Sequence, residues 1–162
     1  MSFFDDNSKG KIFLNPVALD YSFIPKLIPY RENQQHYIAT CIKPLFQDRN
    51  GKNLFIYGNP GIGKTVATIH VFNELEDKSD IVPIYVNCWK RNTAYKIIID
   101  ICEKVGYKFT INKSTDELLD IVTGIINKGS CVICLDECDK LDSDDIVYHF
   151  LENIYKKTVV LI

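Results

Sequence analysis

The sequence predicts an α/β fold in which helices cover both faces of a parallel β-sheet. Short apolar segments typical of strands alternate with longer segments typical of helices, and parallel strands need crossovers of this kind. The apolar segments carry few polar residues on either face, as expected for strands that helices bury on both sides. A glycine-rich turn, 58–65, stands between the first apolar segment and a helical one.

Composition is that of an ordinary globular protein. The 162 residues are 46% hydrophobic and 25% charged, which is enough to build one core. The net charge of −2 comes from 19 basic and 21 acidic residues, so bulk charge does not favour nucleic acid. No apolar run could cross a membrane and no secretory signal begins the chain, so the six cysteines are expected to be reduced thiols in the cytoplasm.

The order of elements follows from apolar runs and breakers along the chain. Residues 1–28 are expected to be irregular, because prolines at 16, 25 and 29 interrupt any long element. Strands are expected over 53–57, 81–88, 131–135 and 158–162. Helices are expected over 32–46, from the glycine-rich turn to about 76, and over 94–105, 115–127 and 146–155.

Several helix ends are marked by single residues. Pro44 should disturb the last turn of the first helix. Side chains able to cap the later helices stand just before them: Asn92 or Thr93, Ser114 in a capping box with Glu117, and Ser143 or Asp144.

The segment Gly58–Thr65 is a complete G-x-x-x-x-G-K-T phosphate-binding loop, with a strand before it and a helix after it. Its glycines allow backbone N–H groups to surround phosphate oxygens, and the helix adds partial positive charge. Lys64 is expected to reach the β- and γ-phosphates of ATP, and Thr65 to offer its hydroxyl to Mg²⁺. The nucleotide-binding residues predicted here are Gly58, Asn59, Pro60, Gly61, Ile62, Gly63, Lys64, Thr65 and Val66.

The stretch CVICLDECDK, residues 131–140, ends a predicted strand in two carboxylates. Asp136 is expected to hold Mg²⁺, largely through water, and Glu137 to polarise an attacking water as the catalytic residue. The adjacent Asp-Glu pair favours an ATPase over a small-molecule kinase. Cys131 and Cys134 are three residues apart, so strand alternation points them to opposite faces and predicts core packing rather than one metal site.

Four stretches together resemble the archaeal-type replication initiators of the AAA+ superfamily. That family combines origin-recognition-complex subunit one and cell-division-control protein six. The stretches are LIPYRENQ at 27–34, NLFIYGNPGIGKT at 53–65, YVNCWKRNTAY at 85–95 and CLDECDKL at 134–141. The resemblance implies that Pro29, Tyr30 and Arg31 lie near the adenine, with Tyr30 standing where the family has His.

The resemblance also implies a three-layer P-loop NTPase fold with a partial AAA+ domain over 29–162. The fourth strand is expected to lie between the first and the third. The domain is expected to be truncated after this fourth core strand. The sensor residue, the arginine finger, the helical lid and the winged-helix domain of the family would come later. We therefore expect this chain to bind ATP and Mg²⁺ but to hydrolyse ATP weakly or not at all.

The implied function is that of an ATP-binding module of a DNA replication initiator, in which ATP is a switch for origin DNA binding and helicase loading. The implied partners are ATP or ADP, origin double-stranded DNA through the full-length protein, other initiator subunits and the replicative helicase, with no membrane. The helices over 94–105 and 115–127 fall where the family carries an element that touches origin DNA. Two alternatives stay open: a regulatory ATPase switch of the signal-transduction type, or another DNA-processing AAA+ ATPase such as a clamp loader.

Overall fold

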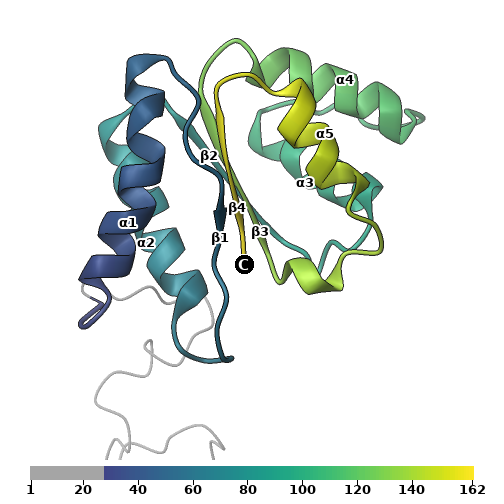
Figure 1. The fold of residues 1–162 in the computed structure, drawn as a ribbon. Helices are drawn as coiled ribbons and strands as arrows, with labels where there is room; N and C mark the ends of the chain where they lie inside the picture. Colours follow the sequence, from purple (N-terminus) through teal and green to yellow (C-terminus); the bar gives the residue numbers. More distant parts are fainter. Residues whose placement is uncertain (1–27) are drawn as a thin grey trace, which may run out of the picture.

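The computed structural model describes residues 28–162, which form three layers. Figure 1 shows a central sheet with α1 and α2 on one face and α3, α4 and α5 on the other. The strands are β1 (Leu54–Phe55), β2 (Val82–Asn87), β3 (Cys131–Asp136) and β4 (Lys157–Leu161). The helices are α1 (Glu32–Ile42), α2 (Lys64–Lys78), α3 (Ala94–Lys104), α4 (Thr115–Ile126) and α5 (Asp145–Asn153).

The predicted parallel sheet is confirmed. All three strand pairings are parallel, and the order is β1-β4-β3-β2. β4 therefore lies between β1 and β3, as the family resemblance implies. The register pairs Tyr85 with Cys134 and Asn87 with Asp136, so the carboxyl ends of β2 and β3 meet at one edge of the sheet. The expected irregular segment 1–28 lies, except for Ile28, outside the described residues.

The first helix and the first strand are the elements that fall furthest short of their predicted lengths. α1 ends at Ile42 and a 3₁₀ turn, η2 (Lys43–Gln47), follows it. Pro44 lies at the start of this turn and has no N–H to continue the α-helical pattern, so its predicted effect is confirmed. β1 contains only two residues, although the N–H of Ile56 still donates to the carbonyl of Leu161 at 2.8 Å.

The predicted helix caps are confirmed in part. The Thr93 hydroxyl accepts a first-turn N–H of α3, and Ser114 and Glu117 form the reciprocal capping box of α4. At α5 the N-cap residue Asp144 makes no side-chain cap, and the hydroxyl of Ser143 instead accepts a first-turn N–H at 3.2 Å. None of the helices described in residues 28–162 has the length and apolar character that crossing a membrane requires.

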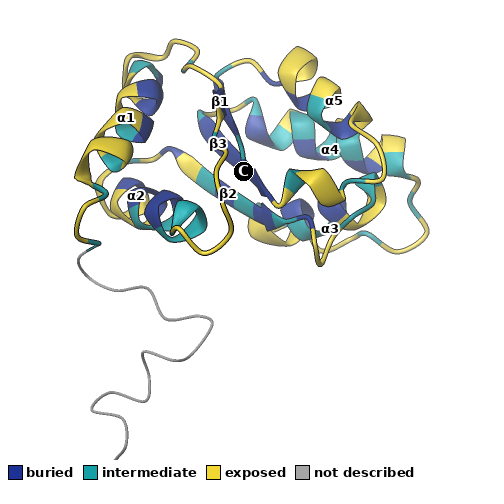
Figure 2. Ribbon diagram, turned by 60° about the horizontal axis from the view of Figure 1, so that its bottom comes forward, coloured by how far each residue is buried: buried dark blue, intermediate teal, exposed yellow. Residues whose placement is uncertain are grey.

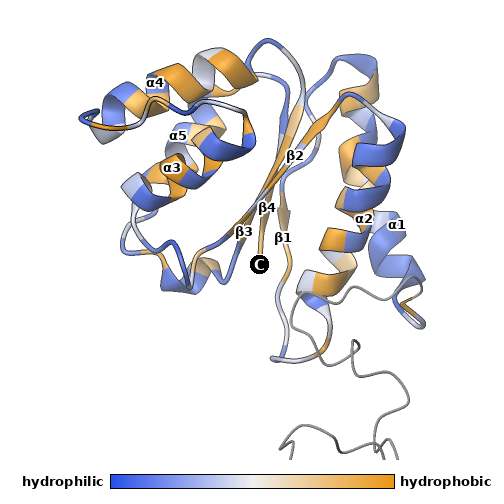
Figure 3. Cartoon of the chain, turned by 180° about the vertical axis from the view of Figure 1, so that it is seen from behind, coloured by the Kyte–Doolittle hydropathy of each residue, from blue (hydrophilic) through white to orange (hydrophobic). Residues whose placement is uncertain are grey.

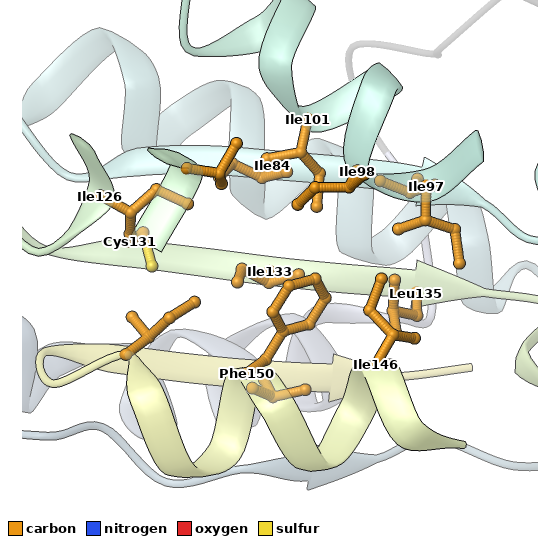
Figure 4. Packing of buried hydrophobic residues seen from close by; sticks show 14 of the residues in the cluster. Ile84, Ile97, Ile98, Ile101, Ile126, Cys131, Ile133, Leu135, Ile146 and Phe150 are labelled. Carbon is orange, nitrogen blue, oxygen red and sulfur yellow. The ribbon is translucent and has the colours of Figure 1, made fainter. Parts of the chain in front are cut away.

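The sheet separates two apolar cores, which we call the α3–α5 core and the α1–α2 core. Figure 2 shows that the buried sides of the helices face the sheet, and Figure 3 shows hydrophobic strands between helices with hydrophilic outer sides. Cys131 lies in the α3–α5 core and Cys134 in the α1–α2 core, so the predicted opposite placement of the two thiols is confirmed. Figure 4 shows the α3–α5 core, where side chains of three helices meet those of the strands: Ile97, Ile98, Ile101, Ile126, Ile146 and Phe150 against Ile84, Ile133 and Leu135.

Candidate nucleotide site

The predicted phosphate-binding loop connects β1 to α2. Gly61 and Gly63 have φ angles of 77° and 87°, left-handed values at which other residues would be strained. Gly63 is the N-cap of α2 and provides no side-chain cap, so the first N–H groups of this helix are suited to an anion. The other predicted residues of this segment lie in the same place: Gly58, Asn59, Pro60 and Ile62 in the loop and Val66 in the first turn of α2.

Two cationic side chains contact the backbone of this loop. Nζ of Lys64 donates to the carbonyl oxygens of Gly58 at 2.9 Å and Asn59 at 3.3 Å, so the ammonium group bridges the loop. Nη2 of Arg31, the N-cap residue of α1, donates to the carbonyl oxygen of Ile62 at 2.6 Å. Both positive charges favour a phosphate ligand, which charge-assisted hydrogen bonds hold more strongly than neutral ones.

Asp136 lies at the carboxyl end of β3 and is only 2% exposed. Its Oδ2 accepts hydrogen bonds from the hydroxyl of Thr65 at 2.9 Å and from the hydroxyl of Tyr85 at 2.6 Å. Its Oδ1 accepts the N–H of Glu137 at 3.1 Å. Carboxylate and hydroxyl oxygens are the ligands that Mg²⁺ prefers, so Thr65 and Asp136 fit a magnesium ion bound together with a nucleotide.

Glu137 directly follows the last residue of β3 and does not continue the strand. It has a left-handed φ of 56° and is exposed, and it precedes the 3₁₀ turn η3 (Cys138–Lys140). Such a backbone is uncommon for a residue other than glycine and is concentrated at functional sites. The turn brings the Glu137 side chain into solvent beside buried Asp136. Its catalytic role stays a prediction.

A hollow of about 420 Å³ opens next to the phosphate loop. Its walls come from α1, from β1 with the residues after it, and from the start of α2, and most of them are apolar or aromatic. The wall includes Tyr37, Ile38, Phe55, Ile56, Tyr57 and Ile62. A mainly apolar hollow with aromatic side chains beside a phosphate loop can accept a flat heteroaromatic ring such as adenine.

The three residues predicted near the adenine take different positions. Arg31 lines the hollow. Pro29 and Tyr30 form an exposed turn before α1, and Tyr30 is 92% exposed with a φ of 66°. The structure therefore brings Arg31 to the loop and leaves Pro29 and Tyr30 on the surface, so their contact with the base stays a prediction.

The cysteines are core residues. Within residues 28–162 no group of three or more His, Cys, Asp or Glu side chains could hold a metal ion, and all six thiols are free. Burial raises the pKa of Cys131 and the pKa of Cys88 to about 12, so both thiols stay protonated at neutral pH. Cys131 and Cys134 themselves pack in different cores, on opposite sides of the sheet.

Two tyrosines of this region were not predicted from the sequence. Tyr37 lines the hollow from α1, and Tyr85 donates to Asp136 from the neighbouring strand. Tyr85 is the third residue from the end of β2, two residues before Asn87. Polar groups at alternating positions near a strand end are the signal that could have identified it, because such groups share one face of the sheet.

Comparisons with known sequences agree with this geometry. The family model of the AAA domain matches residues 47–162. The ORC1-type DNA replication protein 1 of Archaeoglobus fulgidus is 31% identical over 150 residues, a match that covers 87% of this chain and 37% of the relative. The protein of that name from Sulfolobus acidocaldarius is 34% identical over 148 residues, covering 86% of this chain and 37% of the relative. The chain thus spans well under half the length of these curated relatives.

Solved structures show the same architecture. The Aeropyrum pernix ORC1 protein in complex with DNA has a TM-score of 0.76 at 26% identity, covering 88% of this chain and 41% of that one. Cdc6p from Pyrobaculum aerophilum has a TM-score of 0.80 at 21% identity, covering 91% of this chain and 42% of that one, which is evidence for the fold alone. The chain belongs to the AAA domain family and is homologous to the ORC1-type replication proteins.

Proposed function

We propose that this chain is the ATP- and Mg²⁺-binding AAA+ module of a DNA replication initiator that acts in the cytoplasm. The observation that carries the proposal is the 2.9 Å hydrogen bond between the Thr65 hydroxyl and the Asp136 carboxylate. It joins the phosphate loop to the end of β3 across 71 positions of sequence. The residues suited to the phosphates and those suited to the metal therefore meet at one place.

Each side chain has a distinct task in this proposal. Lys64 and the first N–H groups of α2 hold the β- and γ-phosphates, and Thr65 and Asp136 hold the metal. When bound, Mg²⁺ neutralises part of the phosphate charge. Glu137 lies exposed beside Asp136, where its carboxylate can accept a hydrogen bond from water and orient that water.

The base occupies the hollow between α1, β1 and the loop. The aromatic side chains of its walls supply surface on which the base can stack. Arg31 lines the hollow and also donates a hydrogen bond to the phosphate loop, so it contacts both parts of the site. Pro29 and Tyr30 would reach the base only if the turn before α1 moved inward, because Tyr30 is almost fully exposed. We therefore expect Arg31 to matter more for nucleotide affinity than either neighbour.

The action of ATP as a switch is proposed for the longer protein. The relatives that share this domain are named DNA replication proteins, and the similar Aeropyrum pernix structure contains DNA. Because the chain covers 37% of such relatives, origin binding, ATP hydrolysis, contacts with other initiator subunits and helicase loading belong to the larger assembly. ATP would hold that assembly in its DNA-competent state, and hydrolysis would reset it.

Nucleotide binding is tested by replacing Lys64 with Ala and titrating a fluorescent ATP analogue in Mg²⁺. Losing a cation that hydrogen-bonds to phosphate costs about 1.5–3 kcal/mol, so we expect affinity to fall about 10- to 100-fold. The exposed Lys78→Ala variant, at the far end of the same helix, is the matched control and should bind as the parent chain does. Equal affinity of the parent chain, Lys64→Ala and Lys78→Ala for the nucleotide would contradict the proposal.

The initiator function is tested on the longest product of the gene. That protein should bind double-stranded DNA from the replication origin more tightly than unrelated DNA of equal length, and ATP should increase the difference. Binding that depends on neither sequence nor nucleotide would favour the alternative of a regulatory ATPase switch that acts through protein contacts.

A further inference from the structure

Tyr85 connects the edge strand β2 to the residue proposed to hold the metal. It pairs with Cys134 in the ladder, one position from the pair formed by Val86 with Leu135 and two from the Asn87–Asp136 pair. Alternation places the side chains of Tyr85, Cys134 and Asp136 on the same face of the sheet. The Tyr85 hydroxyl then reaches forward to Oδ2 of Asp136 at 2.6 Å.

This hydrogen bond has a defined direction. An ionised carboxylate only accepts hydrogen bonds, so the Tyr85 hydroxyl is the donor. The 2.6 Å separation of the two oxygens lies in the range of hydrogen bonds from a hydroxyl to a charged carboxylate.

The same carboxylate oxygen also accepts the Thr65 hydroxyl at 2.9 Å. Asp136 thus accepts hydrogen bonds from three different elements: the Thr65 side chain on α2, the adjacent N–H of Glu137, and the Tyr85 hydroxyl on β2. Thr65 belongs to the segment that receives the phosphates, and Glu137 has a left-handed backbone at the end of β3. Tyr85 is the donor that comes from the neighbouring strand, whose register with β3 fixes its position.

The Tyr85 ring is itself fixed from the side of α3. Nζ of Lys104 lies 5.9 Å from the centroid of the ring and also donates to the backbone carbonyl of Tyr85. Lys104 is in turn paired with Asp100 at 2.8 Å on the same helix. The orientation of the ring therefore depends on packing outside the phosphate loop.

We infer that Tyr85 is a positioning residue that orients the Asp136 carboxylate for the magnesium ion of the bound nucleotide. The inference rests on the proposed function, because it assigns Tyr85 a task only if Asp136 serves that metal. Mg²⁺ demands nearly ideal octahedral geometry, so a carboxylate free to rotate would support it less well. Hydrogen-bonding partners of metal ligands change metal affinity or activity by about 10- to 100-fold when removed.

The test compares Tyr85→Phe with the parent chain, using a fluorescent ATP analogue with Mg²⁺ and with EDTA. The variant keeps the ring and removes the hydroxyl. We expect its metal-free affinity to stay within about twofold and the gain in affinity given by Mg²⁺ to fall about tenfold. Tyr155→Phe, on an exposed ring beyond the end of α5, is the matched control and should keep the full gain.

A double-mutant cycle with Asp136→Asn separates positioning from general support of the fold. If Tyr85 acts through Asp136, adding Tyr85→Phe to Asp136→Asn should leave the remaining effect of Mg²⁺ unchanged. The inference would be overturned if Mg²⁺ increased the nucleotide affinity of Tyr85→Phe as much as it does for the parent chain, or more. It would also be overturned if Tyr85→Phe lost the same affinity with Mg²⁺ as with EDTA. Failure of the parent chain to bind nucleotide at all would instead overturn the proposed function, and the inference with it.

Discussion

The two faces of the sheet are built differently. On the α3–α5 side, four residues of α3 are completely inaccessible: Ile97, Ile98, Ile101 and Cys102 are all 0% exposed. On the α1–α2 side, three apolar residues of α2 keep some exposure, with Val71 at 7%, Phe72 at 4% and Leu75 at 7%. The candidate nucleotide site lies on the second face, beside the less closely packed helices.

Helix ends show the same contrast. α3 begins at a Thr cap and α4 at a complete capping box, whereas α1 and α2 begin without a side-chain cap. A ligand with phosphate groups would supply the missing partners at α2. We conclude that α3 and α4 satisfy first-turn N–H groups with side chains of this chain, whereas α2 leaves first-turn N–H groups that a ligand can satisfy.

Replacing a matched leucine on each face gives the largest expected difference. Leu118 of α4 is 0% exposed and Leu75 of α2 is 7% exposed. Leu→Ala changes in cores cost about 2–5 kcal/mol, depending on how far the site can collapse. We expect about 4 kcal/mol for Leu118→Ala and about 2.5 kcal/mol for Leu75→Ala, measured by urea unfolding with equal m-values. The reverse order would contradict the proposed difference between the faces.

Binding of ATP with Mg²⁺ should stabilise the α1–α2 face more than the α3–α5 face. At a concentration about 100 times its Kd, ATP with Mg²⁺ should raise the free energy of unfolding by about 2.7 kcal/mol. In hydrogen exchange we expect the first turn of α2 to gain protection and the first turn of α4, which has its own cap, to change little. Equal protection of both turns would mean that the ligand acts on the whole domain.

The parts of the fold that the sequence predicted are those that local rules decide. Apolar runs identified four strands, and alternation placed Cys131 and Cys134 on opposite faces. The capping box at Ser114 followed from spacing alone. Thr65 and Asp136 were each expected from a motif to serve Mg²⁺, and a hydrogen bond joins their side chains in the structure.

The parts that the sequence did not predict depend on how elements pack. The contact of Tyr85 with Asp136 requires the β2–β3 register, which no local pattern specifies. The bond from Arg31 to Ile62 requires α1 to lie against the start of α2. Both contacts are decided by tertiary structure. The contact of Tyr30 with the base stays a prediction, because Tyr30 lies in an exposed turn before α1.

Removing the cap of α4 should have a smaller effect, confined to stability. Ser114→Ala leaves a first-turn N–H without its partner and should cost about 1 kcal/mol. Ser114→Asp keeps an acceptor at the same place and is the matched control. Because α4 lies on the face away from the loop, neither variant should change the affinity for nucleotide. A change in affinity without a change in unfolding would show that the two faces are coupled.

The smallest expected effect concerns two buried thiols that occupy equivalent positions. Cys41 faces the sheet from α1 and Cys102 faces it from α3, with exposures of 2% and 0%. A buried thiol reacts with an alkylating reagent only when its surroundings open, so the labelling rate reports local opening. Half-buried Cys138 should react first and serves as the internal reference.

We expect Cys41 to be labelled about threefold faster than Cys102, which corresponds to about 0.7 kcal/mol less free energy of opening around α1. Labelling takes place in the opened state, where both thiols face solvent, so a difference in rate reports the opening. Mass spectrometry of timed samples measures both sites in one protein. Saturating ATP with Mg²⁺ should slow Cys41 and leave Cys102 unchanged, because the ligand contacts the helices of only one face. Faster labelling of Cys102 would place the weaker packing on the α3–α5 side and reverse the comparison.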